Sequence, residues 1–245
     1  MIKRILIICS IVLLSVYMIA AMTILNAKPA GLKCEEMVLS VKDDVDYGFV
    51  TSRDIHNLLK KNRLFPIGKN LSDINIRNIE ETLVKNPFIR DAECYITSGG
   101  KIGIDIYQRI PIVRVMSSNG DNYYIDNEGK IMNSYNKPVH VAIATGNIDR
   151  KYAQNELYHL AKYIVYNDFW RAQTEQINIT AAKEIEIIPR VGNHVLFLGK
   201  SKDYHEKFSK LQTFYSQALS NVGWNKYKRI SIEFNNQIIC TKKGE

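Results

Sequence analysis

A long uncharged run near the amino terminus constrains the chain more than any other feature. Lys3 and Arg4 precede it, and from Ile5 to Ala27 no charged residue occurs over 23 positions. A helix rises about 1.5 Å per residue, so such a run can cross the roughly 30 Å hydrocarbon core of a bilayer. The run predicts a single membrane-spanning helix over residues 5–27, with residues 1–4 as a short basic tail.

A cleaved signal peptide is the alternative interpretation of this run. The apolar part of a signal peptide usually has about 7–15 residues and ends at an A-x-A-like site. The run is longer, and no such triplet follows it, which favours an uncleaved anchor. Lys28, Lys33 and Lys42 follow the run and balance the basic tail, so basic-residue bias alone does not orient the helix.

The rest of the chain has the composition of a folded, mildly basic protein. Hydrophobic residues make up 46% and charged residues 24% of the sequence, which excludes a disordered or collagen-like chain. Of 33 basic residues, three lie in residues 1–28, so 30 remain against 25 acidic ones, a net charge of +5. They are scattered as single residues and pairs, which predicts an ordinary solvated surface and no nucleic-acid partner.

A first unit follows a short linker at residues 28–33, which contains proline and glycine. Alternating apolar residues predict strands near 37–41, 89–97 and 101–108. Two helical patterns lie between the first and second of these strands. We therefore expect residues 34–110 to form a β-α-α-β-β unit, with two helices on one face of a three-stranded sheet.

The two helices of this unit have recognisable starts. Thr51-Ser-Arg-Asp54 has the pattern of a capping box, and Ser72-Asp73 is expected to cap the second helix, which ends at Asn86-Pro87. The predicted core consists of large aliphatic residues: Leu58, Leu59, Ile76, Ile79, Leu83, Ile102, Ile104 and Ile106.

Beyond Arg109-Ile-Pro111 the pattern changes to short strands separated by glycine-containing turns. Two helices are predicted, one from Leu157 to Val165 and one from about Asp203. Alternating residues from Arg229 to Thr241 end the pattern. The chain is therefore expected to have an α+β fold, with residues 111–245 forming a mixed, strand-rich β domain with two helices.

The sequence contains no recognisable catalytic or metal-binding motif. Leu198-Gly-Lys-Ser201 ends like a phosphate-binding loop, but His194 stands where that motif requires glycine. Asp126 and Glu128 form a candidate acid–base pair, although D-N-E-G more often makes a turn. The histidines show none of the spacings of metal sites. We expect no catalytic residue, no cofactor and no metal.

The cysteines leave one question open. Cys9 lies inside the uncharged run, and Cys34, Cys94 and Cys240 remain, an odd number with no C-x-x-C spacing. This pattern indicates no metal or full disulfide framework, while a single bridge among the three stays open in an oxidising compartment.

Four short segments stand out: NPFIRDA at 86–92, GIDIYQRIP at 103–111, YIDNEGKI at 124–131 and ISIEFNNQI at 230–238. They resemble motifs of the FtsQ/DivIB family of bacterial division proteins. The order of the predicted elements, from basic tail and spanning helix to the two units, is similar as well. Each segment alone is short, but their order and spacing match over nearly the whole chain.

The resemblance implies a bacterial inner-membrane protein at the division septum, with a cytoplasmic amino terminus and its bulk in the periplasm. Residues 34–110 would form a polypeptide-transport-associated (POTRA) domain. Other divisome proteins are possible binding partners of this domain. The implied role is a non-enzymatic divisome scaffold that binds FtsB- and FtsL-type bitopic partners. The implied partner-binding residues lie in the final strand region: Phe234, Asn235, Asn236, Gln237, Ile238, Ile239 and Thr241.

Such binding has a physical basis, because an edge strand offers unpaired N–H and C=O groups to a partner strand. Two other functions stay open. One is a membrane-anchored periplasmic POTRA protein for transport or assembly, although such proteins usually carry several modules. The other is a periplasmic enzyme, against which the missing catalytic motifs count.

Overall fold

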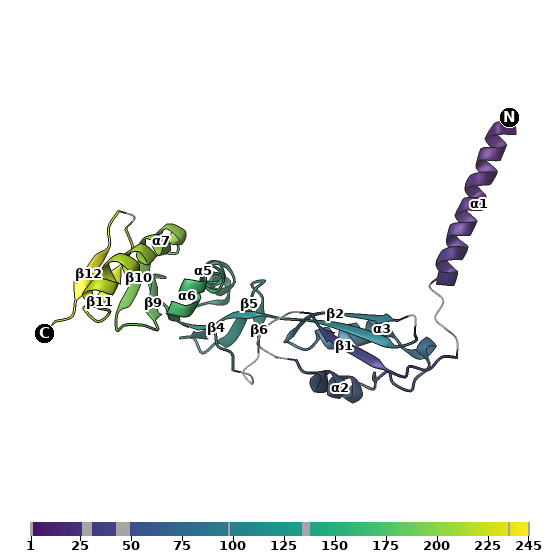
Figure 1. Cartoon of the computed structure of the whole chain (residues 1–245), viewed down its shortest axis with the longest axis horizontal. Coiled ribbons are helices and arrows are strands. Elements are labelled where there is room, and N and C mark those ends of the chain that lie inside the picture. The colour runs from purple at the N-terminus through teal and green to yellow at the C-terminus, as the bar shows by residue number, and fades with distance from the viewer. Residues whose placement is uncertain are drawn as a thin grey trace. The chain divides into compact units, whose positions relative to one another are not determined.

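The computed structural model describes residues 2–25, 31–42, 50–97, 99–133, 138–234 and 236–244 (Figure 1). The chain divides into two compact units, and the second begins at Gln108. Each unit has its own sheet.

The amino-terminal helix α1 runs from Ile2 to Leu25. Its large apolar side chains between Ile11 and Met22 are exposed. In the part of the chain that the structure describes, no helix reaches the combination of length and hydropathy that marks a membrane span. The structure therefore does not show the span expected at residues 5–27.

The first unit contains a three-stranded sheet in the order β1-β3-β2. Its strands are β1 (Met37–Val41), β2 (Ile89–Ile96) and β3 (Ile102–Gln108). The central strand β3 runs parallel to β1, with Leu39 beside Ile104. Parallel neighbours require a crossover, which here contains α2 (Ser52–Lys61), the short 3-10 helix η1 (Leu71–Asp73) and α3 (Ile76–Val84).

The start of α2 agrees with the prediction, whereas the start of α3 does not. Thr51 and Asp54 form the expected capping box, in which the Asp54 amide donates to Thr51 Oγ1 at 3.2 Å. Ser72 and Asp73 lie in η1 instead of capping α3. The cap is Asn75, whose side-chain oxygen accepts from the Asn78 amide at 3.1 Å. The shift follows from burial, because η1 and the residues after it place Leu71 and Ile74 in the core.

Most of the predicted core of this unit is buried. Leu59, Ile79, Leu83 and the three isoleucines of β3 are almost fully inaccessible. Leu58 and Ile76 are only half-buried. Ile55 of α2, Leu71 of η1 and Ile74 just after η1 are buried as well.

The second unit contains one nine-stranded sheet in the order β12-β11-β10-β9-β8-β7-β4-β5-β6. Its strands are β4 (Pro111–Ser117), β5 (Asn122–Asp126), β6 (Ile131–Met132), β7 (Ala142–Gly146), β8 (Thr174–Ile179), β9 (Ile185–Pro189), β10 (Val195–Gly199), β11 (Tyr227–Ser231) and β12 (Ile239–Lys242). The pairs β4/β7, β7/β8 and β10/β11 are parallel, and the other pairs are antiparallel. Mixed pairing with two helical crossovers makes the unit α+β.

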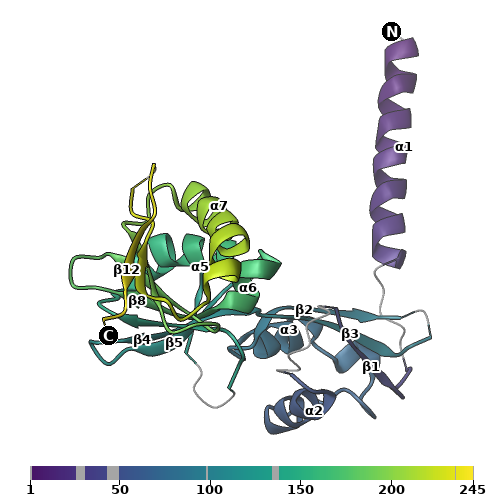
Figure 2. The same ribbon diagram turned by 60° about the vertical axis from the view of Figure 1, so that its left-hand side comes forward.

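Helices connect two of the parallel pairs and gather on one side of the strands (Figure 2). The first crossover has α4 (Arg150–Tyr152), η2 (Ala153–Leu157), α5 (Tyr158–Val165) and α6 (Asp168–Gln173), and the second has α7 (Tyr204–Phe214), η3 (Tyr215–Leu219) and α8 (Ser220–Val222). The sequence analysis missed α6, which is too short to show a helical period. Asn167 caps it by accepting from the Trp170 amide at 3.1 Å.

One core fills the space between these helices and the sheet. Trp170 and Phe208 pack edge to face with ring centres 4.7 Å apart, and both are buried. The same cluster includes Ile177, Leu196 and Ile230 from strands β8, β10 and β11. Burial of this face fixes β11, and β11 in turn supports the terminal strand β12.

Candidate partner-binding edge

Strand β12 forms one edge of the nine-stranded sheet. It pairs antiparallel with β11, so that Thr241 lies beside Arg229, Cys240 beside Ile230 and Ile239 beside Ser231. Among the residues that the structure describes, no strand lies on its other side. An edge of this kind presents backbone donors and acceptors to a partner.

Two hydrogen bonds identify which backbone groups face outward. The Ile232 amide donates to the Phe197 carbonyl at 2.9 Å, and the Lys243 amide donates to the Lys226 carbonyl at 3.3 Å. Backbone groups of successive residues point to opposite sides of a strand. Ile232 faces β10, so Ser231 and Arg229 face β12. Their partners Ile239 and Thr241 therefore turn toward β11, as Lys243 does through its own bond. Cys240 and Lys242 turn their N–H and C=O groups to the open side.

The predicted contact residues differ in their exposure. Phe234 is 51% and Ile239 45% exposed, so both offer apolar surface at the edge. Ile238 is half-buried and packs against the core. Asn235 lies outside the described residues. The remaining predicted residues are exposed side chains in the connection and on the strand: Asn236, Gln237 and Thr241.

The thiol of Cys240 faces the core side of β12. Burial raises its pKa, which keeps the thiol protonated and weakly reactive. Cys34, Cys94 and Cys240 carry free thiols, so the single disulfide left open by the sequence is not formed.

Helix α7 holds the two turns that border β11. Buried Lys207 donates from Nζ to the Leu198 carbonyl at 2.8 Å and to the Lys200 carbonyl at 3.3 Å. Burial lowers the pKa of Lys207, while the carboxylates of Asp203 and Glu233 oppose that shift. Lys210, one turn along the helix, donates to the Phe234 carbonyl at 3.4 Å. The connection between β11 and β12 is thus tied to the helix.

Side-chain bonds also tie β11 to the strands beyond β10. The Arg229 guanidinium donates to Glu186 Oε1 at 3.1 Å and lies 4.1 Å from the centre of the Phe197 ring. Glu186 Oε2 in turn accepts from Asn178 Nδ2 at 3.0 Å. These contacts link β8, β9, β10 and β11 through their side chains. Strand β12 therefore pairs with a part of the sheet that side-chain contacts stabilise.

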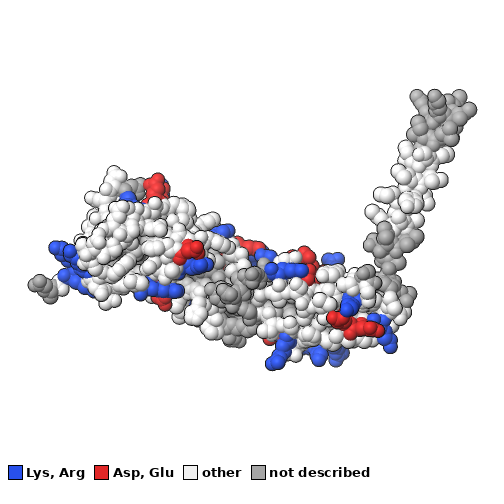
Figure 3. Space-filling view, in the orientation of Figure 1, with Lys and Arg blue, Asp and Glu red and all other residues white. Residues whose placement is uncertain are grey.

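Four lysines come together around this edge: Lys226, Lys228, Lys242 and Lys243. All four are exposed, and within the described ranges none of them forms an ion pair. Figure 3 shows blue side chains gathered at the end of the second unit that carries β11 and β12. Sequence analysis treated these residues as scattered charges, because only the pairing of Tyr227 with Lys242 makes them neighbours.

Asp126 is a structural residue of a turn, as the D-N-E-G pattern favoured. It is almost fully buried, and its carboxylate accepts from the Glu128 amide at 3.0 Å and the Lys130 amide at 2.8 Å. Arg109 forms an ion pair with it at 2.7 Å. This pair joins the two segments at 103–111 and 124–131 that carry the family resemblance, a link that sequence spacing did not reveal.

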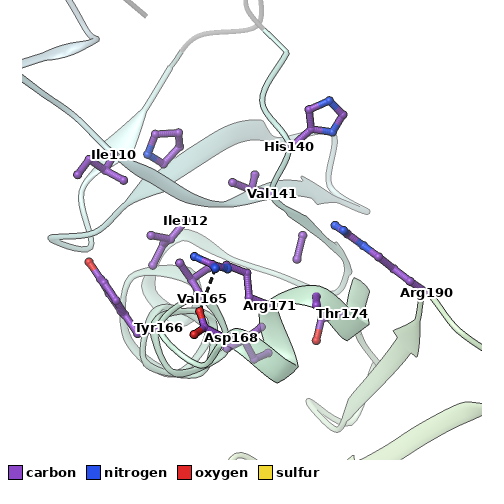
Figure 4. A pocket seen from close by; sticks show the side chains of 14 residues that line it. Ile110, Ile112, His140, Val141, Val165, Tyr166, Asp168, Arg171, Thr174 and Arg190 are labelled. Carbon is purple, nitrogen blue, oxygen red and sulfur yellow. Dashed lines mark hydrogen bonds and ion pairs between the residues drawn. The ribbon is translucent and has the colours of Figure 1, made fainter. Parts of the chain in front are cut away.

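A pocket of about 480 Å³ lies elsewhere in the second unit (Figure 4). Its walls combine apolar residues, such as Ile112, Val141 and Val165, with polar and charged ones. The arginines at its rim are engaged, since Arg171 pairs with Asp168 at 2.9 Å and Arg190 with Glu175 at 2.8 Å. Over the described parts of the chain, no cluster of three or more His, Cys, Asp or Glu residues suits a metal.

Comparison with protein-family models gives two matches, one for each unit. A POTRA-like domain model matches residues 32–107, and the model described as FtsQ/DivIB, C-terminal related, matches residues 110–241. No curated protein is similar enough to count as a match. The FtsQ/DivIB model covers more than half of the chain and extends from just after β3 into β12. The chain therefore belongs to the FtsQ/DivIB family.

Proposed function

We propose that the chain docks FtsB- and FtsL-type bitopic partners at the open edge of β12, as a scaffold of the bacterial division machinery. The FtsQ/DivIB and POTRA-like matches imply a non-enzymatic scaffold role in cell division. The observation that carries the finer proposal is the edge position of β12, with β11 on one side and no described strand on the other.

Strand addition gives each part of this edge a role. A partner strand pairs with the outward N–H and C=O groups of Cys240 and Lys242, and each such bond contributes about 0.5–1.5 kcal/mol net. The exposed side chains of Phe234, Ile239 and Thr241 contact the partner's side chains and so contribute to specificity. The bonds from Lys207 and Lys210 preorganise the edge, which lowers the entropic cost of docking.

We also propose that residues 5–27 anchor the protein in the inner membrane, with the two units in the periplasm at the septum and the POTRA-like unit open to other divisome proteins. The uncharged run and the family support this arrangement. A reporter fused after Glu245 tests it. Activity of a reporter that works only in the cytoplasm would refute the proposed orientation.

Proline substitution tests the docking edge directly. Cys240→Pro removes an outward donor, and an edge strand tolerates proline where its N–H faces solvent. We expect the variant to fold but to lose the partner. Cys240→Ala serves as the matched control, because it removes the thiol and keeps the donor. Binding of FtsB- or FtsL-type partners and thermal unfolding of the full chain are measured together.

The neighbouring residue provides the contrast. Ile239→Pro removes a donor that faces Ser231 within the sheet, so it should destabilise the β11–β12 pair as well as weaken binding. If folded Cys240→Pro bound partners as tightly as Cys240→Ala does, docking at β12 would be rejected.

A further inference from the structure

We infer that the β12 edge selects an acidic partner strand, in which Asp or Glu residues alternate with apolar ones. The inference rests on the proposed function, because it names the chemistry of the segment that docks at the same edge. Its support is independent of the family, since it comes from charge and register.

Among the described residues, the charge around the edge is positive and unpaired. Lys242 ends β12 and Lys243 follows it, Lys226 and Lys228 lie behind them at the start of β11, and no described carboxylate pairs with any of the four. The nearby acid Glu233 is directed elsewhere. Its Cγ lies 2.9 Å from the point where a Cβ on Gly199 would sit, so its side chain covers the turn after β10. Among the described side chains at this edge, an incoming carboxylate therefore meets unpaired lysines.

The alternation of side chains defines where acidic residues belong. Lys242 and Cys240 share one face of β12, whereas Ile239 and Thr241 share the other. Directly opposed side chains on neighbouring strands have Cβ atoms about 4.5–5.5 Å apart, close enough for charge pairs and apolar pairs. A carboxylate opposite Lys242 and apolar or β-branched residues opposite Ile239 and Thr241 satisfy this edge.

An anionic lipid surface is the other candidate for a cluster of lysines. It would engage the ammonium groups but leave the outward backbone groups of Cys240 and Lys242 without partners. The combination of an open strand edge with exposed Phe234 and Ile239 instead favours a peptide strand. The lysines then favour a peptide strand with negatively charged side chains.

Two peptide probes test this selectivity on the full chain in detergent. One alternates glutamate with valine, and the other alternates lysine with valine. We expect only the acidic peptide to bind, with affinity that falls as salt rises because exposed charge pairs are screened. Replacing Lys242 and Lys243 by glutamine should weaken binding about two- to fivefold per lysine. Lys60→Gln with Lys61→Gln, an exposed adjacent pair on α2, is the matched control and should change nothing.

The outcomes separate this inference from the proposed function. If both peptides bound equally and without salt dependence, yet Cys240→Pro abolished binding of FtsB- or FtsL-type partners, the docking edge would stand and charge selection would fall. Loss of acidic-peptide binding in Cys240→Pro but not in Cys240→Ala supports both. Lysine acetylation in nanodiscs tests the lipid alternative. Slower labelling of Lys242 and Lys243 in phosphatidylglycerol discs than in neutral discs, with no selectivity between the peptides, would assign the lysines to lipid and overturn the inference.

Discussion

Strands β2 and β12 both lie at the edge of a sheet, but their outward backbone groups are treated differently. The Cys94 amide of β2 donates to Glu80 Oε1 on α3 at 2.8 Å, and the Ala92 amide donates to Asp91 Oδ1 at 2.9 Å. The Thr97 amide donates to the Lys101 carbonyl within the β2–β3 hairpin and so faces β3. Because backbone groups alternate along a strand, the amides of Cys94 and Ala92 face away from β3. Two outward donors of β2 are thus occupied by carboxylates.

At β12 the outward groups of Cys240 and Lys242 have no such carboxylate among the described side chains, and lysines surround them. An open edge is a hazard for a soluble unit, because it invites pairing with any extended chain. The same protein blocks one edge with acids and leaves another open beside bases. This difference supports the proposed use of the open edge, and the following predictions test the contrast.

The largest effect is expected from Ile104→Asp in β3, the central strand of the first sheet. The substitution places a charge in a fully buried site, so the first unit should lose about 4 kcal/mol or more of its free energy of unfolding. Hydrogen exchange should show loss of protection in β1, β2 and β3 while β12 stays protected on its β11 side. Wild-type protection of β2 would show that the assigned core face is wrong.

A smaller effect is expected from Glu80→Ala, which uncovers the Cys94 amide. Loss of a charged hydrogen bond to a part-buried amide should cost about 1–3 kcal/mol. The opened β2 edge should also gain weak, concentration-dependent self-association, detectable by analytical ultracentrifugation. Glu81→Ala is the matched control, because Glu81 is an exposed neighbour that pairs with Arg77 instead. Equal behaviour of the two variants would show that Glu80 does not block the edge.

A pH-dependent effect is expected near β12. His194 is buried, with its Nε2 at 2.8 Å from Tyr215 Oη, and burial lowers its pKa. The carbonyl of Trp224 opposes this shift, and the charge of Lys243 adds to it. The unfolded chain therefore binds the proton first, at a pKa of about 6.5. Stability of the second unit should be full above that pH and should fall below it.

Chemical unfolding of the full chain between neutral and mildly acidic pH measures this dependence. His194→Gln should flatten the pH profile of the second unit. His205→Gln, which alters an exposed histidine, should retain the wild-type profile. An unchanged profile in His194→Gln would contradict the assignment.

The smallest effect concerns thiol reactivity at the two edges. Burial, with the charges of Glu80 and Asp105, raises the pKa of Cys94 to about 12. Burial alone raises the pKa of Cys240. Because the thiolate is the reactive form, alkylation of Cys94 should be slow at neutral pH and should speed up in Glu80→Gln. The rate at Cys240 should not respond to that substitution, and mass spectrometry distinguishes the two sites.

Local signals predicted much of the fold. The Thr51–Asp54 capping box and the alternating residues of β2 and β3 depend on neighbours in sequence, so the sequence contains what is needed to identify them. The predicted start of α3 was wrong. Leu71 and Ile74 are buried, and the residue that caps α3 is Asn75. The sequence did not predict helix α6, because a helix of six residues is too short to show a helical period.

The candidate site was less predictable, because it depends on strand pairing. Family resemblance pointed to residues 234–241, but sequence could not say that Cys240 and Lys242 carry the outward backbone groups. That assignment needs the register of β11 against both neighbours. The lysines gather for the same reason, since Lys226 and Lys243 meet only after the strands pair.

The place of β12 in the chain has a consequence for biogenesis. Every other described strand of the large sheet precedes β12 in sequence, and among the described strands β12 pairs with β11 alone. During synthesis from the amino terminus, β11 must first join β10 through the crossover that contains α7, and only then can the docking edge form. A nascent or truncated chain that lacks β12 would instead expose β11. If partners dock at β12 as proposed, their capture would require that β11 has already joined the sheet.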